Sequence, residues 1–247
     1  MRYFIQFLYD GTDYFGYQKQ PEHISVQQTL ESALSRMLRK DIYTTGAGRT
    51  DTGVHAREMF AHFDVEEKLP DNLVKKLNSY LPPDISIKSI FQVKDSAHAR
   101  FDAVRRTYQY FISTQKNPFK QRFHAQFLHY DLDVEIMNKA SEILLEYTDF
   151  TSFSKLHSDN KTNECAIYRA DWEQREGELI FTISANRFLR NMVRAIAGTL
   201  IDVGRGKIDV VKFREIIEKK DRTFASTSAP AKGLVLINVE YPQDILI

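Results

Sequence analysis

The chain has 247 residues, of which 43% are hydrophobic and 27% are charged. This length allows one large domain or two small ones, and the composition excludes an intrinsically disordered chain. The formal net charge is +1. Such a balance gives no overall sign of a nucleic-acid partner, although a local basic patch can be hidden in the total.

The N-terminus and the cysteine content bear on the cellular compartment. The opening MRYFIQFLYD is interrupted by Gln6 and Asp10, too early for a signal peptide or a membrane span, so we expect no membrane partner. Cys165 is the one cysteine and has no second cysteine in the chain to pair with. A chain without internal disulfides suits a reducing compartment, so we expect a cytoplasmic protein.

The first half of the chain alternates strand and helix signals. Residues 2–9 are rich in Tyr, Phe and Ile and predict a strand, which ends at the turn-forming Asp10-Gly11-Thr12-Asp13. Ser25 followed by Gln28 resembles a capping box and predicts a helix from there to about residue 39. We further expect a strand at 57–65, a helix at 71–80 and a strand at 85–93.

The second half repeats this order. We expect a strand at 105–114, a helix at 133–147 capped by Asp133, and a hairpin of 164–174 with 178–185. Two helices at 187–203 and 209–220 then precede a last strand at 234–241. Two successive β-α-β arrangements predict an α+β protein with mainly antiparallel sheets and two split-βαβ (ferredoxin/RRM-like) halves. We place the first half at residues 1–104 and the second at 105–247.

The segment GAGRTDTGVHA, residues 46–56, holds three of the ten glycines within eight residues. It fits neither a Walker A loop nor a Rossmann fingerprint, because Arg49 follows Gly48 and Asp51 stands where a third small residue is needed. Two interpretations of Asp51 stay open at this point. It is a catalytic nucleophile or base, or its carboxylate accepts backbone N–H bonds in a structural turn.

Asp51-Thr52-Gly53 is also the triplet of aspartic proteases. Those enzymes need two carboxylates that share a proton, and this chain has one such triplet. Because Arg49 and Arg57 favour a fully ionised Asp51, we disfavour a protease. His55 and His62 lie seven residues apart with no cysteine or third histidine nearby, so we expect hydrogen-bonding or packing histidines rather than a metal site.

Arginines and aromatic residues are interleaved in HARFDAVRRTYQY, residues 98–110. In a strand, Arg106, Tyr108 and Tyr110 lie on one face, which suits phosphate binding and base stacking in single-stranded RNA. The same pattern also fits a strand with packed tyrosines and solvated arginines.

A second arginine-rich segment, RFLRNMVRAIAG at residues 187–198, predicts a helix capped by Asn186. Its polar seam shares one helix face and the other faces are apolar; the seam is Arg187, Arg190, Asn191, Arg194 and Gly198. Charge on an otherwise buried helix needs an anionic partner. We expect that partner to be a carboxylate such as Asp51, or RNA phosphate.

Eight segments in order resemble the tRNA pseudouridine synthase A family over nearly the whole chain. They are Tyr9-Asp10-Gly11-Thr12 with Gly16-Tyr17-Gln18, Ser25-Val26-Gln27, Ala47-Gly48-Arg49-Thr50-Asp51-Thr52-Gly53-Val54-His55, His98-Ala99-Arg100-Phe101, Arg105-Arg106-Thr107-Tyr108-Gln109-Tyr110, Asp149-Phe150-Thr151-Ser152-Phe153, Met192-Val193-Arg194 with Gly198, and Ala229-Pro230 with Gly233-Leu234.

This resemblance implies conversion of uridine to pseudouridine in the anticodon stem-loop of tRNA, at tRNA positions 38 to 40. It implies no metal and no organic cofactor, a homodimer, and two α+β halves with a basic cleft between them. Carried over by motif, Asp51 is the nucleophile, Tyr108 stacks on the target uracil, and Arg194 holds the aspartate. Arg49 and the segment around Arg100 contact the RNA, to which the strand pattern adds Arg106.

The resemblance leaves several points open. Asp51 adds to C6 of uracil or acts at the ribose, and the sequence does not choose between these routes. The three glycines of residues 46–53 would let RNA approach the Asp51 loop. Tyr17 stands where members often have Trp, and Arg190-Asn191 depart from the usual residues. A non-catalytic RNA-binding protein is the alternative, but its aromatic RNP1 signature is absent.

Overall fold

The computed structural model describes residues 1–155 and 162–247, which form two compact units. The first unit comprises Met1–Arg105 together with Leu236–Ile247, and the second comprises Arg106–Val235. The C-terminal stretch, which the sequence analysis assigned to the second half, therefore belongs to the first unit. Two hydrogen bonds hold it there: Val239 N–H donates to Glu58 Oε1 at 3.0 Å, and Lys94 N–H donates to the Ile245 carbonyl at 3.0 Å.

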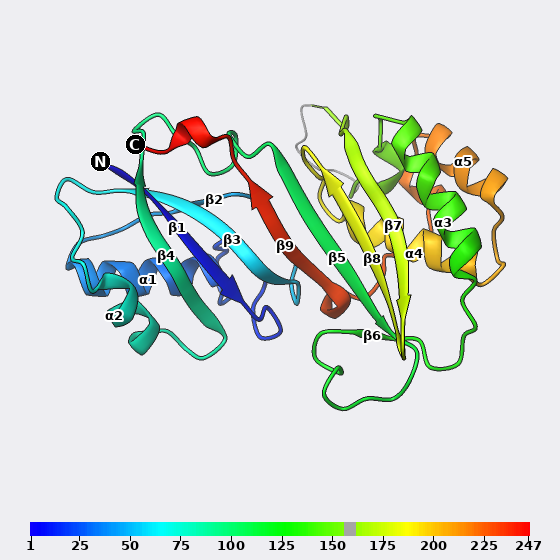
Figure 1. Ribbon diagram of the computed structural model, residues 1–247, viewed down its shortest axis with the longest axis horizontal. Coiled ribbons are helices and arrows are strands. Elements are labelled where there is room, and N and C mark those ends of the chain that lie inside the picture. Colours follow the sequence, from blue (N-terminus) through cyan, green and yellow to red (C-terminus); the bar gives the residue numbers. More distant parts are fainter. Residues whose placement is uncertain (156–161) are drawn as a thin grey trace. The chain divides into compact units, whose positions relative to one another are not determined.

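The first unit is built on an antiparallel sheet (Figure 1). Its central strand pairs with a neighbour on each side in the order β4-β1-β3, and a short strand pairs with β3. The strands are β1 (Arg2–Tyr9), β2 (Thr45–Gly46), β3 (His55–Asp64) and β4 (Ile85–Val93). A last strand, β9 (Leu234–Glu240), follows β3 in the strand order.

Two helices complete the first unit. They are α1 (Val26–Leu38) and α2 (Leu73–Tyr80), which pack against each other, while α2 also packs on β4. The predicted cap of α1 is present, because Ser25 Oγ accepts the N–H of Gln28 at 3.2 Å. An N-cap bond of this kind satisfies one of the backbone donors left unpaired at a helix start.

The second unit also has an antiparallel sheet, in the order β5-β8-β7, and one short parallel pair. Its strands are β5 (Arg105–Ser113), β6 (Ala125–Gln126), β7 (Ile167–Arg175) and β8 (Glu178–Ala185). Three helices pack together beside β7 (Figure 1): α3 (Val134–Ile143), α4 (Met192–Gly204) and α5 (Val210–Glu218). The mainly antiparallel α+β class predicted from the sequence is confirmed.

Short 3-10 helices join these elements. They are Leu144–Glu146, Thr151–Phe153, Arg222–Phe224, Ala231–Gly233 and Gln243–Ile245. The first of them continues α3, so the helix predicted to run to residue 147 ends as an α-helix at Ile143 and finishes in a tighter turn.

The predicted helix at 187–203 is wrong in its first turn. The α-helix begins at Met192, after Asn191 in the left-handed region with φ 66°. Asn186 Oδ1 does accept the N–H of Arg187 at 2.8 Å, but it also accepts the N–H of Ala166 at 2.8 Å. This second bond fixes the segment to the residue that precedes β7. Arg187 and Arg190 therefore share no helix face with Arg194, and the predicted arginine seam does not exist.

Candidate active site

Asp51 lies in the loop between β2 and β3, four residues before β3 begins. The loop lies beside the end of β1, where Tyr9 pairs with Ala56. Its backbone turns tightly, since Val54 N–H donates to the Asp51 carbonyl at 3.1 Å. The structural turn proposed from the sequence is thus present in the backbone, and Asp51 itself is half-buried.

The segment after β1 holds this loop in place. Tyr17 N–H donates to the Thr50 carbonyl at 3.3 Å, and Gly53 N–H donates to the Tyr14 carbonyl at 3.4 Å. The hydroxyls of Tyr9 and Thr50 lie within hydrogen-bond distance, at 2.9 Å. The residues on both sides of Asp51 are therefore fixed to one neighbouring segment.

Two glycines of that segment make the close approach possible. A Cβ on Gly11 would lie 2.0 Å from the Val54 carbonyl oxygen, and one on Gly16 would lie 2.4 Å from that of Thr50. Gly16 also has φ +83°, a conformation that side chains disfavour. Neither position has room for a Cβ without moving the backbone on either side of Asp51.

The three glycines of residues 46–53 have separate uses. A Cβ on Gly46 would lie 2.3 Å from the Tyr17 ring, so Gly46 gives room for packing, and the expectation that it lets RNA approach is wrong. Gly53 has φ 75°, which the turn requires. Gly48 has no atom within 4 Å of a Cβ built on it, so this position has open space beside it.

Both histidines make hydrogen bonds, as predicted. Buried His55 accepts the N–H of Gly11 on Nδ1 at 3.0 Å, and His62 accepts that of Ala99 on Nδ1 at 3.1 Å. Burial lowers the pKa of His62 to about 4. In residues 1–155 and 162–247, no group of three or more His, Cys, Asp or Glu side chains is arranged to hold a metal ion.

Two candidate RNA contacts lie in the first unit with Asp51. Arg49 is exposed, two residues before Asp51 in the same loop. Arg100 is exposed in the turn that follows β4, with its guanidinium carbon 5.6 Å from the centroid of the Phe101 ring. Phe101 is itself 74% exposed. An exposed arginine beside an exposed aromatic ring suits stacking on an unpaired base.

The structure distinguishes Tyr108 from Tyr110 on β5. Tyr110 is fully buried, and its hydroxyl donates to the Pro230 carbonyl at 2.9 Å. Tyr108 is half-buried and meets Phe188 edge to face, with ring centroids 5.3 Å apart. Arg106, on the same face of the strand, donates from Nη1 to the Asn186 carbonyl at 2.7 Å. Tyr110 is a core residue, which leaves Tyr108 as the stacking candidate.

Arg194 lies in the first turn of α4. Its Nε donates to the Ala229 carbonyl at 2.8 Å, and its own carbonyl accepts the Ala229 N–H at 2.9 Å. The helix packs closely there, because a Cβ on Gly198 would lie 2.1 Å from the Thr227 carbonyl oxygen. The segment 227–229 thus fixes the direction in which the Arg194 side chain leaves the helix.

The candidate residues are divided between the units. Asp51, Arg49 and Arg100 belong to the first, and Tyr108 and Arg194 to the second. Arg222, which lines a hollow with Arg194, was not predicted from the sequence, because it carries no periodic or motif signal of its own. The sequence signal that was available is the cluster of four hydroxyl residues after it, Thr223 and Ser226, Thr227 and Ser228.

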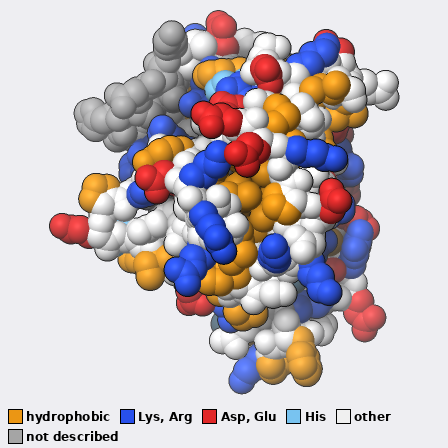
Figure 2. All heavy atoms as spheres, turned by 90° about the vertical axis from the view of Figure 1, so that its left-hand side faces the viewer, with side chains coloured by type: hydrophobic (Ala, Val, Ile, Leu, Met, Phe, Trp, Pro, Cys, Tyr) orange, Lys and Arg blue, Asp and Glu red, His pale blue; other side chains and the backbone are white. Residues whose placement is uncertain are grey.

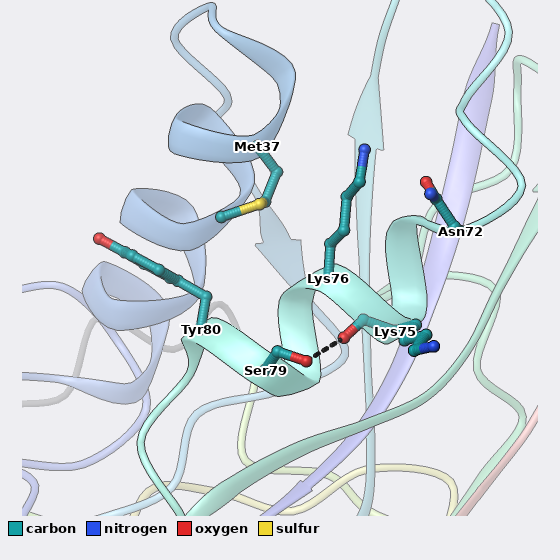
Figure 3. A pocket seen from close by; sticks show the side chains of 6 residues that line it. All are labelled: Met37, Asn72, Lys75, Lys76, Ser79 and Tyr80. Carbon is teal, nitrogen blue, oxygen red and sulfur yellow. Dashed lines mark hydrogen bonds between the residues drawn. The ribbon is translucent and has the colours of Figure 1, made fainter.

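A groove on the first unit contains none of the candidate residues. It runs between α1 and α2, where Met37 faces the side of α2 that carries Lys76 and Tyr80 (Figure 3). The one hydrogen bond drawn there is internal to α2, from Ser79 Oγ to the Lys75 carbonyl at 3.0 Å. Figure 2 shows basic and acidic side chains interspersed with apolar ones on this side of the molecule, so no single charge dominates it.

Comparison with known proteins decides the family. A family model described as tRNA pseudouridine synthase matches residues 5–102 and 145–242. The chain belongs to the tRNA pseudouridine synthase family. As a member it is an enzyme of the isomerase class. The matched residues include the Asp51 loop and Arg194, while Tyr108 lies in the stretch between them.

Individual relatives extend the match over that stretch. A protein named tRNA pseudouridine synthase A from Bacteroides thetaiotaomicron is 56% identical over 99% of this chain and 92% of its own length. One of that name from Porphyromonas gingivalis is 50% identical over 100% of this chain and 99% of its own. A third from Caldicellulosiruptor bescii is 41% identical over 94% of this chain and 96% of its own.

None of the helices in residues 1–155 and 162–247 combines the length and the apolar composition that crossing a bilayer takes.

Proposed function

We propose that this chain isomerises uridine to pseudouridine in the anticodon stem-loop of tRNA, at tRNA positions 38 to 40, with Asp51 as the nucleophile. The observation that carries the proposal is the family match across the Asp51 loop, whose flanking residues are fixed by the segment 10–17. A catalytic carboxylate needs such fixed placement, because small errors in position cost large factors in rate.

The reaction exchanges one glycosidic bond for another. The C1′–N1 bond breaks, uracil turns, and a C1′–C5 bond forms; C5 loses its hydrogen and N1 regains one, so no atoms are gained or lost. Asp51 adds to C6 of uracil or acts at the ribose, and either route uses an ionised carboxylate. Arg194, carried over by its motif, holds that carboxylate.

The other candidate residues bind and hold the base. Tyr108 stacks on the target uracil and retains it while it is detached from the ribose. The base leaves its stack to be reached, at a cost of a few kcal/mol that pocket contacts offset. Arg49, Arg100 and Arg106 contact the RNA. We further propose a homodimer, active in the cytoplasm without metal or organic cofactor.

The test uses an unmodified tRNA transcript with tritium at uracil C5, which is released when pseudouridine forms. Asp51→Ala is compared with the wild type at matched protein and RNA concentrations, and tRNA binding is measured by filter retention. We expect release by the wild type, no detectable release by the variant, and binding by both. Binding by both without release by either would favour the non-catalytic RNA-binding protein instead.

A further inference from the structure

A hollow in the second unit is lined by two arginines and a run of small polar residues. Arg194 and Arg222 face it together with residues of the loop after the 3-10 helix Arg222–Phe224; the loop members are Thr223, Ala225, Ser226, Thr227 and Ser228. Of these residues only Arg194 takes part in the proposed reaction.

The loop itself holds the Arg222 guanidinium. Nη1 donates to the Ala225 carbonyl at 3.0 Å, and Nη2 donates to Ser228 Oγ at 3.1 Å. A guanidinium has five N–H donors, so these two bonds leave three to donate elsewhere. The side chain is half-buried, and its planar fork is held in one orientation by its own loop.

The positive charge of Arg222 has no carboxylate partner within 4.0 Å among the described residues. Asp221, next to it in the chain, instead accepts from the N–H and the hydroxyl of Thr223, each at 2.8 Å. Burial lowers the pKa of Arg222. Arg214 and Arg175 of the same unit, in contrast, are paired, with Glu146 and with Glu173. A half-buried cation without a counter-ion is costly unless it binds an anion.

Hydroxyl groups add donors at the same place. Ser228 Oγ accepts from Asn191 Nδ2 at 2.6 Å and from Arg222 Nη2 at 3.1 Å. With both lone pairs occupied, its hydrogen is free to donate. The hydroxyls of Ser226 and Thr227 make no hydrogen bond to any described residue. The hollow therefore offers unused donors and the charge of Arg222, and its lining includes no carboxylate.

We propose that Arg222, with the hydroxyls of Ser226, Thr227 and Ser228, binds a backbone phosphate of the substrate RNA. A phosphodiester has negative charge and several acceptor oxygens, which match a fixed guanidinium fork and neighbouring hydroxyls. The inference rests on the proposed function, because that function makes RNA the substrate. It assigns Arg222 to RNA binding and not to the chemical step.

The test measures binding of the unmodified tRNA transcript by filter retention between about 50 and 200 mM KCl, with kcat and KM from tritium release. We expect Arg222→Gln to raise Kd and KM about tenfold, equivalent to about 1.4 kcal/mol, with kcat close to the wild-type value. The slope of log K against log salt falls by about 0.7 to 0.9 for one lost phosphate contact. Arg222→Lys keeps the charge but loses the planar fork of donors. We therefore expect its salt slope to lie near the wild-type value while its Kd stays above that of the wild type.

A second pair of variants leaves the Arg222 hydrogen bonds intact. Thr227 is exposed at the hollow, so Thr227→Glu places a negative charge there while Thr227→Gln adds nearly the same bulk without charge. We expect the first to weaken tRNA binding strongly. The second loses one hydroxyl but adds no charge, so we expect it to weaken binding much less. Wild-type Kd and salt slope in both Arg222→Gln and Thr227→Glu would overturn the subsite, and so would a loss confined to kcat. If the wild type releases no tritium but these binding differences persist, the proposed function fails and the subsite stands.

Discussion

At the scale of single residues, the position of Asp51 depends on atoms that its neighbours lack. Gly11 and Gly16 allow the backbone of one segment to lie directly on the backbone of residues 50–54. The missing Cβ atoms are as important here as any side chain that is present. Asp has a short side chain, so fixing the backbone of its loop restricts the carboxylate more than it would restrict a charged group at the end of a long flexible side chain.

Gly16→Ala tests this placement. The new Cβ would lie 2.4 Å from the Thr50 carbonyl oxygen at a φ of +83°, so the Asp51 loop must move. We expect kcat for pseudouridine formation to fall about tenfold to a hundredfold with KM for tRNA little changed. Gly48→Ala is the control, since nothing lies within 4 Å of its Cβ, and it should keep the wild-type kcat. Equal kcat values for the two variants would contradict the argument.

His62 makes the stability of the protein depend on pH. Burial is the main cause of its lowered pKa of about 4; Arg2 and His98 lower it further, while Asp64 and Asp102 act in the opposite direction. The native state therefore holds the neutral ring in a range where the unfolded chain, with an ordinary pKa near 6.5, binds a proton. This stabilisation is present above about pH 6.5 and is lost as the pH falls towards 4.

Urea unfolding at two pH values checks this prediction. We expect the free energy of unfolding to fall by about 2 kcal/mol from about pH 7 to pH 5, because the unfolded chain binds a proton on His62 over this range and the native state does not. His62→Asn keeps an acceptor for the Ala99 N–H and does not titrate, so its stability should change less over the same interval. A variant with the same pH dependence as the wild type would show that other groups are responsible.

At the scale of elements, β5 carries two tyrosines on one face with different surroundings. Tyr110 donates its hydroxyl to the Pro230 carbonyl from a fully buried position, and Tyr108 is half-buried against Phe188. The alternation of a strand places both on the same side. The packing of each position then assigns one to the core and leaves the other for the substrate.

Substitutions on β5 separate these roles. We expect Tyr110→Phe to lower the free energy of unfolding by about 1 kcal/mol through the lost hydrogen bond, with kcat nearly unchanged. Tyr108→Ala removes the stacking ring and should lower kcat strongly at little cost in stability, while Tyr108→Phe keeps most activity. Thermal unfolding and tritium release measure the two effects. An inactive Tyr110→Phe beside an active Tyr108→Ala would reverse the assignment.

At the scale of the whole molecule, the two ends of the chain meet in the first unit. The Val104 N–H donates to the Glu240 carbonyl at 2.8 Å, and the Tyr241 hydroxyl donates to the Ala99 carbonyl. The Tyr241 ring lies edge-on to Phe4 and to Phe60, with centroids 5.2 Å apart in each case. The first unit is therefore complete only when the last residues of the chain have been added.

Tyr241→Ala tests the contribution of this end. The loss of two aromatic contacts and of a hydrogen bond should lower the free energy of unfolding by about 2 to 3 kcal/mol. Tyr43→Ala, at a position in the same unit that is 73% exposed, should be nearly neutral. Denaturant unfolding measures both. Equal, small effects would show that the C-terminal stretch adds little to the first unit.

The sequence by itself determined the features that depend on residues close together in the chain. The strands 2–9 and 85–93 and the Ser25 cap of α1 follow from residue type and spacing over a few positions, and the structure has all three. The resemblance of ordered motifs indicated the family, and comparison confirmed it. The importance of the Asp51 segment was visible, because its glycines and arginines are crowded into a short stretch.

Only the tertiary structure decided the features that depend on distant contacts. The α4 helix begins at Met192 and not at the predicted residue 187. Asn186, the predicted cap, also accepts the N–H of Ala166 from another part of the chain. Gly46 packs on Tyr17, 29 residues away, and Arg222 lines a hollow with Arg194. Periodicity and propensity are sums over adjacent residues, whereas these outcomes are set by which surfaces the folded chain brings together.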